Sequence, residues 1–151
     1  MQADRPPLRI MTDVFVADEG PSGIGVAAAN APATSISALY EQSFGEPEQL
    51  YLQSVLRALQ LGKDLSADKI CVLCPDERTV RIVNREISLK PGSPLAPLYM
   101  RIRAQMYTYR QAEVRAVART RVRQARGLAL TASRMPVRPA NPQYEMFALA
   151  G

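Results

Sequence analysis

The chain contains no histidine and only two cysteines among its 151 residues. The absence of imidazole excludes Ser-His-Asp and Cys-His catalysis and every zinc site that needs histidine. Cys71 and Cys74 have the spacing of a redox C-x-x-C pair, but they lie in an apolar run, residues 70–74, that is typical of a strand. Because side chains three residues apart on a strand face opposite sides, we expect two buried apolar residues rather than a dithiol.

Long apolar runs are also missing. No stretch approaches the roughly 20 apolar residues of a membrane-spanning helix, and residues 1–10 lack the apolar core of a signal peptide. We therefore expect a cytoplasmic protein with no membrane segment. Apolar residues still make up 47% of the chain, enough for a folded core. We assign residues 1–133 to one domain and residues 134–151, which carry three prolines, to an extended tail.

Positive charge is unevenly distributed along the chain. The net charge is +5, but residues 1–100 carry 9 basic and 12 acidic side chains, whereas residues 101–151 carry 10 arginines against Glu113 and Glu145. Such asymmetry favours an acidic partner, most commonly nucleic acid. The alternative is that the arginines solvate helix surfaces or reflect an arginine-favouring genome, since the chain has 16 arginines and 3 lysines.

The spacing of apolar and turn residues predicts the order of the secondary structure. We expect strands over 8–17, 24–29 and 35–44, a helix over 47–63, a strand over 70–74, a short helix from Asp76 to Val83, a helix opening at Ser93 or Pro94, a strand over 113–118 and a helix over 119–132. This order predicts an α/β fold with a five-stranded mixed sheet flanked by helices, in which the first and fourth strands pair in parallel.

Four motifs occur in a recognisable order. Thr12-Asp13 precedes residues 20–26, which read G-P-S-G-I-G-V; residues 55–61 read V-L-R-A-L-Q-L, residues 95–99 read L-A-P-L-Y, and residues 114–119 read V-R-A-V-A-R. Together these motifs resemble those of type 1 ribonuclease H over about residues 8–133. The resemblance implies a ribonuclease H-like fold. It also implies the chemistry of that family, in which four carboxylates hold two metal ions that hydrolyse the RNA strand of an RNA/DNA hybrid.

The resemblance also indicates what has been lost. It places the family's four metal-binding carboxylates at Asp13, Tyr51, Pro75 and Arg126, so only Asp13 is retained. A neutral phenol, with a pKa near ~10, is a poor substitute for a carboxylate, and an arginine reverses the charge. The resemblance therefore implies a catalytically degenerate member of the family, in which Asp13 pairs with Arg126 in place of a metal cluster.

We interpret the chain as a non-catalytic domain that binds nucleic acid, either RNA or an RNA/DNA hybrid, through its arginine-rich C-terminal half, without a cofactor. The candidate binding residues are Arg101, Arg103, Arg119, Arg121, Arg123 and Arg126. If they share a face, they could follow a phosphate backbone. Three tyrosines are candidates for stacking on bases, namely Tyr99, Tyr107 and Tyr109, although Tyr109 also fits the apolar stripe of its helix.

Two alternatives remain open. One is a structural or protein-interaction domain, including a homodimer. The other is an active nuclease with magnesium or manganese bound at Asp13, in which Glu48, one turn before Tyr51, and Asp76, next to Pro75, complete a displaced catalytic set. Glu48 and Asp76 also have structural explanations, as an acidic residue in the first turn of a helix and as an N-cap.

Overall fold

The structure is a computed structural model that describes residues 5–31, 37–136 and 143–145. Its elements are β1 (Leu8–Phe15), β2 (Ser22–Ala28), β3 (Ala38–Ser43), α1 (Pro47–Asp64), β4 (Lys69–Cys74), α2 (Glu77–Val83), α3 (Ala96–Tyr107), β5 (Gln111–Ala116), the 3-10 turn η1 (Arg119–Arg121), α4 (Arg123–Ser133) and β6 (Gln143–Glu145). The predicted order of strands and helices is confirmed, with ends that differ by a few residues.

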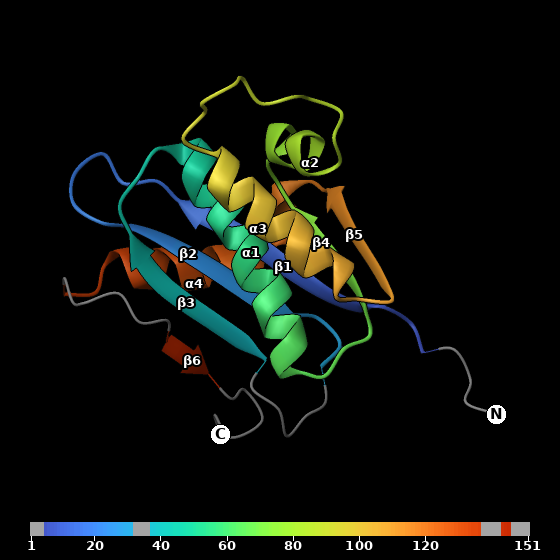
Figure 1. The fold of residues 1–151 in the computed structure, drawn as a ribbon. Helices are drawn as coiled ribbons and strands as arrows, with labels where there is room; N and C mark the ends of the chain where they lie inside the picture. Colours follow the sequence, from blue (N-terminus) through green and yellow to red (C-terminus); the bar gives the residue numbers. More distant parts are fainter. Residues whose placement is uncertain (1–4, 32–36, 137–142, 146–151) are drawn as a thin grey trace.

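The strands form one mixed sheet in the order β5-β4-β1-β2-β3-β6 (Figure 1). The first three strands follow one another directly and pair antiparallel. Because the long helix α1 precedes β4, the chain crosses over, and β4 pairs in parallel with β1, with Ile70 opposite Leu8. β5 extends this parallel part. The predicted five-stranded mixed sheet is confirmed, and β6, three residues of the predicted tail, adds an antiparallel strand beside β3.

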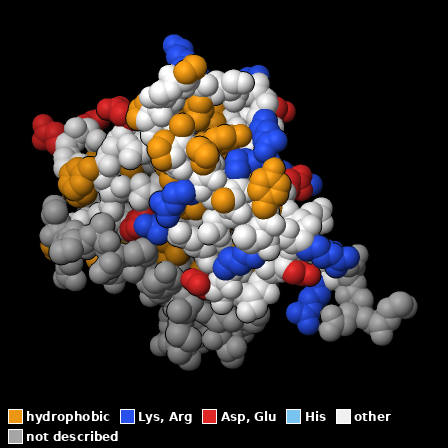
Figure 2. Space-filling model, in the orientation of Figure 1, with side chains coloured by type: hydrophobic (Ala, Val, Ile, Leu, Met, Phe, Trp, Pro, Cys, Tyr) orange, Lys and Arg blue, Asp and Glu red, His pale blue; other side chains and the backbone are white. Residues whose placement is uncertain are grey.

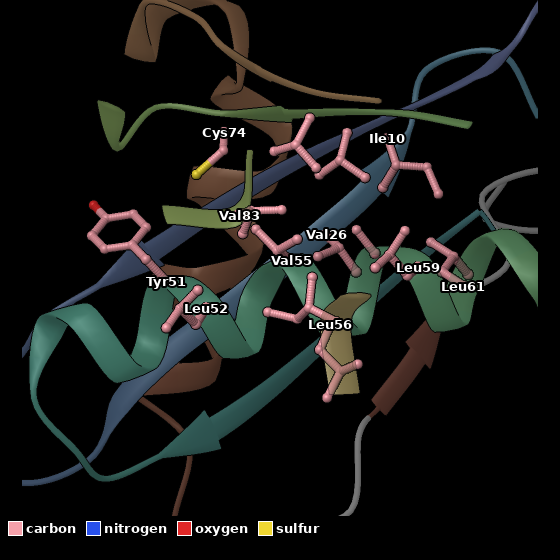
Figure 3. Packing of buried hydrophobic residues seen from close by; sticks show 14 of the residues in the cluster. Ile10, Val26, Tyr51, Leu52, Val55, Leu56, Leu59, Leu61, Cys74 and Val83 are labelled. Atoms are coloured by element: carbon pink, nitrogen blue, oxygen red, sulfur yellow. The ribbon is translucent and has the colours of Figure 1, made fainter. Parts of the chain in front are cut away.

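One face of the sheet is covered by α1, with α3 packed against α1 (Figure 1). The apolar side chains of α1 are buried almost all around the helix because the sheet lies on one side and α3 on another. Leu52, Val55 and Leu59 are 0% exposed. They belong to the largest hydrophobic cluster, which also contains Ile10 and Val26 of the sheet (Figure 3).

The opposite face is covered by α4, which packs directly on β2 (Figure 1). Two glycines of β2 permit this approach. A Cβ at Gly23 would lie 1.8 Å from the carbonyl oxygen of Ala129, and a Cβ at Gly25 would lie 2.2 Å from that of Ala125. The helix backbone occupies the space of both side chains, so any larger residue would push α4 away from the sheet.

The two cysteines lie on opposite faces of the sheet. Cys71 packs in the small cluster under α4, whereas Cys74 belongs to the main core. Both are buried and free, so the interpretation of this C-x-x-C as two apolar core residues is confirmed. Burial raises the pKa of the Cys74 thiol to about 12, which keeps it protonated at neutral pH.

The final helix begins later than the sequence predicts. Residues 119–121 form η1, and α4 starts at Arg123. Between them, Val122 has a φ of −122°, outside the helical range, and its side chain is buried in a cluster with Cys71 and Leu73 of β4 and Ala125 of α4. The predicted helix is therefore divided at Val122, and Arg119 lies in η1 rather than in α4.

Parts of two predictions lie outside the described residues, namely the first two residues of the strand predicted over 35–44 and most of the tail over 134–151. In the part of the chain that the structure describes, no helix combines the length and apolarity needed to cross a membrane.

Candidate functional site

Asp13 lies near the end of β1, and its side chain is 0% exposed. Its Oδ1 accepts a hydrogen bond of 2.8 Å from the backbone N–H of Val14. Its Oδ2 is buried and accepts no hydrogen bond from any described residue. A buried carboxylate oxygen without a donor is costly, so the charge of Asp13 depends on nearby cations.

Two guanidinium groups approach Oδ2 of Asp13. Arg119 Nε lies 3.4 Å away and Arg126 Nη1 lies 3.9 Å away. Both contacts are ion pairs rather than formed hydrogen bonds. The predicted pairing of Asp13 with Arg126 is confirmed, and Arg119 is a second and closer partner that the sequence did not indicate.

Each arginine is held in place by a further contact. Arg126 Nη1 donates to the carbonyl oxygen of Val14 at 3.1 Å, and its guanidinium carbon lies 5.4 Å from the centre of the Phe15 ring. Arg119 Nη2 donates to the hydroxyl of Tyr51 at 2.6 Å. Arg119 therefore connects β1 to α1, while Arg126 connects β1 to α4.

The charges at this site are not balanced. Burial raises the pKa of Asp13 above its ordinary value, and the Val14 N–H and the charges of Arg119 and Arg126 offset only part of this effect. The arginine side chains are 52% and 35% exposed, so water screens both of them. With one carboxylate against two guanidinium groups, the cluster is net positive whether or not Asp13 is ionised.

Tyr51, at a position where the resemblance predicts a metal-binding carboxylate, is buried and neutral. Burial and, after it, the negative charge of Asp13 raise the pKa of its phenol. Tyr51 and Cys74 lie at the same end of the main core (Figure 3). Three of the four positions indicated by the resemblance, Asp13, Tyr51 and Arg126, are thus within contact of one another through Arg119 or directly.

The other two carboxylates of the nuclease alternative are held by different partners. Glu48 Oε1 lies 2.6 Å from Arg78 Nε, and its side chain is half-exposed. Asp76 Oδ2 accepts hydrogen bonds from the backbone N–H and the hydroxyl of Thr79, at 3.0 and 2.5 Å. Asp76 is therefore the N-cap of α2, and Glu48 lies in the first turn of α1, as their structural explanations predict.

These residues do not fit a divalent cation. Magnesium and manganese take oxygen ligands, chiefly carboxylates, yet a single carboxylate is present here and two cations lie against it. Across the described residues, no three acidic or cysteine side chains are grouped so that they could hold a metal ion. A metal ion at Oδ2 would also be repelled at close range by Arg119 and Arg126.

The six candidate arginines form two groups rather than one strip. Arg101 and Arg103 lie on α3, on the α1 side of the sheet, whereas α4, which carries Arg123 and Arg126, covers the other side (Figure 1). Arg119 and Arg121 lie in η1, which precedes α4. This separation arises because β5 enters the sheet between the two helices. Arg121 and Arg123 are exposed beside Arg119. That each of the six binds nucleic acid stays a prediction.

Comparison with solved structures identifies the fold. The chain is similar to the ribonuclease H1 of the archaeon Halobacterium salinarum, with a TM-score of 0.75 and 15% identity over 84% of this chain and 97% of that chain. It is also similar to an N-terminal ribonuclease H domain from Mycobacterium tuberculosis, with a TM-score of 0.68 and 19% identity over 83% and 94% of the two chains. A ribonuclease H1 isolated from compost, solved in complex with an RNA/DNA hybrid, matches with a TM-score of 0.72 and 18% identity over 83% and 96%.

These similarities define an α/β protein with the fold of ribonuclease H. The fold expected from the sequence motifs is therefore confirmed. No protein-family model matches the chain, and no curated protein sequence matches it.

Proposed function

We propose that this chain is a non-catalytic ribonuclease H-fold domain of the cytoplasm that binds nucleic acid, either RNA or an RNA/DNA hybrid, without a metal ion. The observation that carries the proposal is the pair of guanidinium groups at the buried Asp13. Two proteins with this fold were solved with an RNA/DNA hybrid, the ribonuclease H1 from compost and a foamy viral protease-reverse transcriptase, of which the match spans 21%. They make such a ligand the first to test here.

Arg119 and Arg126 are suited to a phosphate group. A guanidinium presents several donors in a planar fork that matches the oxygens of a phosphate. Arg119 donates one hydrogen bond to the Tyr51 hydroxyl, and Arg126 donates one to the Val14 carbonyl oxygen. Both side chains remain partly exposed, so their other N–H groups are available to a ligand. Because the cluster is net positive, it attracts an anion at the position where the catalytic family holds its metal ions.

Hydrolysis has little support from the same residues. Two-metal cleavage needs carboxylates to hold the ions that activate water and stabilise the leaving oxygen. An arginine cannot accept a proton in place of a base, and it cannot bind a metal ion. Oδ2 of Asp13 lies against two guanidinium groups, and its Oδ1 accepts a hydrogen bond from a backbone N–H. Both carboxylate oxygens are therefore directed at groups other than a metal ion that could activate water.

Binding to a fluorescent RNA/DNA hybrid in EDTA, followed by anisotropy, tests the proposal. We expect measurable affinity that falls steeply with salt. Arg119→Ala and Arg126→Ala should each weaken it by about five- to tenfold, because each loses a charged hydrogen bond to phosphate. Arg134→Ala is the matched control, since Arg134 is an exposed arginine at the far end of α4, and we expect less than about a twofold change.

Asp13→Asn separates phosphate binding from metal-dependent catalysis. The substitution removes the only negative charge of the cluster, so we expect binding in EDTA to become about threefold tighter. With magnesium or manganese present, we expect neither the parent protein nor Asp13→Asn to cleave the hybrid. Metal-dependent cleavage that Asp13→Asn abolishes would establish the nuclease alternative instead. Affinity that is insensitive to both salt and Arg119→Ala would contradict the proposed function.

The protein-interaction and homodimer alternatives stay hypotheses. Sedimentation of the full chain alone and with the hybrid would separate them, because a nucleic-acid-binding monomer changes mass only when the hybrid is added.

A further inference from the structure

A row of tyrosine and arginine side chains follows one face of α3. Tyr99, Arg103 and Tyr107 recur every four residues, so they lie on the same side of the helix and span about 12 Å. Tyr107 is 71% exposed. Tyr109, in contrast, is buried in the main core, with its hydroxyl donating to the carbonyl oxygen of Leu59. Of its two predicted roles, the core role is confirmed and the stacking role is wrong.

Two arginines contact Tyr107, one at its hydroxyl and one at its ring. Arg85 Nη2 donates to the Tyr107 hydroxyl at 2.9 Å, and the Arg103 guanidinium carbon lies 5.5 Å from the centre of the ring. Arg103 is itself fixed, because its Nη1 donates to the carbonyl oxygen of Val83 at 3.1 Å. A ring held at its hydroxyl and by one cation is oriented before any ligand arrives, and 71% of the surface of Tyr107 is exposed.

Arg85 reaches Tyr107 from the end of α2. It has a φ of 64°, in the left-handed region that residues other than glycine seldom adopt. Asn84, the residue before it, donates from its side chain to the carbonyl oxygen of Val114 at 3.0 Å, which ties this turn to β5. The position of Arg85 is therefore set by the fold rather than by a flexible loop.

The first turn of α2 lies near the Asp13 site, because the charge of Asp76 helps to raise the pKa of Tyr51, and Arg85 lies beyond the other end of the helix. Asp76 caps its first turn, and Arg85 lies two residues past its last residue, Val83, so that nine positions at the helical rise correspond to about 13 Å. Arg78 and Arg81 lie between them on α2. Both are exposed and paired with glutamates in contacts of 2.6 and 3.9 Å. Exposed pairs of this kind are weak, so a phosphate can replace the glutamate.

The surface over α3 has the composition of a stacking site. Figure 2 shows hydrophobic side chains gathered over this helix, with lysine and arginine side chains beside them. Proteins that bind unpaired bases combine exposed aromatic rings with a cationic path for the backbone. Bases inside a duplex are already stacked on one another, so an exposed ring of this kind adds little to the binding of a blunt hybrid.

We infer that Tyr107, together with Arg85 and Arg103, binds an unpaired base and its phosphate in a single-stranded segment of RNA or DNA, and that the backbone of this segment continues along α2 to Arg119. The inference rests on the proposed function, which it extends from the Asp13 site to a second site with a different ligand chemistry.

The test compares a blunt RNA/DNA hybrid with the same hybrid carrying a single-stranded extension, both in EDTA, by fluorescence anisotropy. Tyr107→Ala should weaken binding of the extended hybrid by about five- to fiftyfold, because it removes one base-stacking contact, and should leave the blunt hybrid within about twofold. Tyr107→Phe should stay close to the parent, since it keeps the ring. Phe44→Ala is the matched control, because Phe44 is an exposed aromatic residue after β3, at 62% exposure.

A second measurement reports on stacking itself. A fluorescent base analogue in the extension should be quenched on binding to the parent and to Tyr107→Phe, but not to Tyr107→Ala. If Tyr107→Ala binds the extended hybrid as well as the parent does, while Arg119→Ala still weakens both ligands, the stacking site is refuted and the proposed function stands. If Arg119→Ala leaves both ligands unchanged and binding is insensitive to salt, the proposed function itself fails.

Discussion

Glu41 on β3 and Asp13 on β1 are both buried carboxylates beside arginine, but their surroundings differ. Glu41 is 3% exposed, and its Oε1 accepts hydrogen bonds from Arg57 at 2.8 Å and from Gln53 at 2.9 Å. Oδ2 of Asp13 has two cations near it and no formed hydrogen bond from the described residues. Glu41 is satisfied within the protein, whereas Asp13 is held in an unbalanced, positively charged cluster that is suited to bind an anion.

This difference separates a structural ion pair from a functional one. A buried charge stabilises a fold only when hydrogen bonds replace the water that it loses. Glu41 meets that condition, but Asp13 does not, so Asp13 and its arginines cost stability that Glu41 and Arg57 do not. Residues that cost stability in this way are more typical of binding sites than of packing.

Loss of the arginine should give the largest contrast between the two sites. Arg57→Ala leaves Glu41 buried with only Gln53 as a donor, so we expect the free energy of unfolding to fall by about 2–3 kcal/mol. Arg119→Ala removes a half-exposed ion pair, and we expect a loss below about 1 kcal/mol. Urea unfolding followed by circular dichroism measures both. Equal losses would mean that Asp13 depends on its arginine as much as Glu41 does.

Neutralising the carboxylate should have opposite signs at the two sites. Glu41→Gln weakens the charged hydrogen bond from Arg57, so we expect a loss of about 1–2 kcal/mol. Asp13→Asn removes a desolvated charge and keeps an oxygen for the Val14 N–H, so we expect the stability to stay level or to rise by about 1 kcal/mol. A clear loss of stability in Asp13→Asn would show that its ion pairs outweigh the cost of its burial.

The smallest expected effect is the pH dependence of the contribution that Asp13 makes to the free energy of unfolding. The folded-state pKa of Asp13 lies above its unfolded value of 3.8, so its ionisation opposes folding. The penalty is absent below pH 3.8, grows as the pH rises from there to the folded pKa, and is complete above it. The stability gained by Asp13→Asn should therefore be largest at about pH 7 and shrink towards about pH 4. If the stability gained by Asp13→Asn instead grows as the pH falls, the pKa of Asp13 is lowered rather than raised on folding.

Much of the fold could be predicted from local patterns. The alternation of strands, the four-residue spacing in helices and the glycine and proline turns act between neighbours in the chain, so they indicate the element order and the parallel pairing of β1 with β4. The replacement of family carboxylates by Tyr51, Pro75 and Arg126 is also visible in the sequence. The start of α4 could not be predicted, because Val122, which precedes it, is buried against Cys71 and Leu73 of β4, about 50 residues earlier in the chain.

The sequence by itself indicated two of the charged groups of the Asp13 site, namely one retained carboxylate and Arg126, which the resemblance places where a second carboxylate is expected. Only the tertiary structure decided how they meet. Arg119 reaches Tyr51, 68 residues away in sequence, because η1 turns it toward the end of the sheet, and Glu41 meets Arg57 because β3 lies beneath α1. Contacts between residues so far apart in the chain depend on the packing of whole elements against one another, and no local spacing in the chain records that packing.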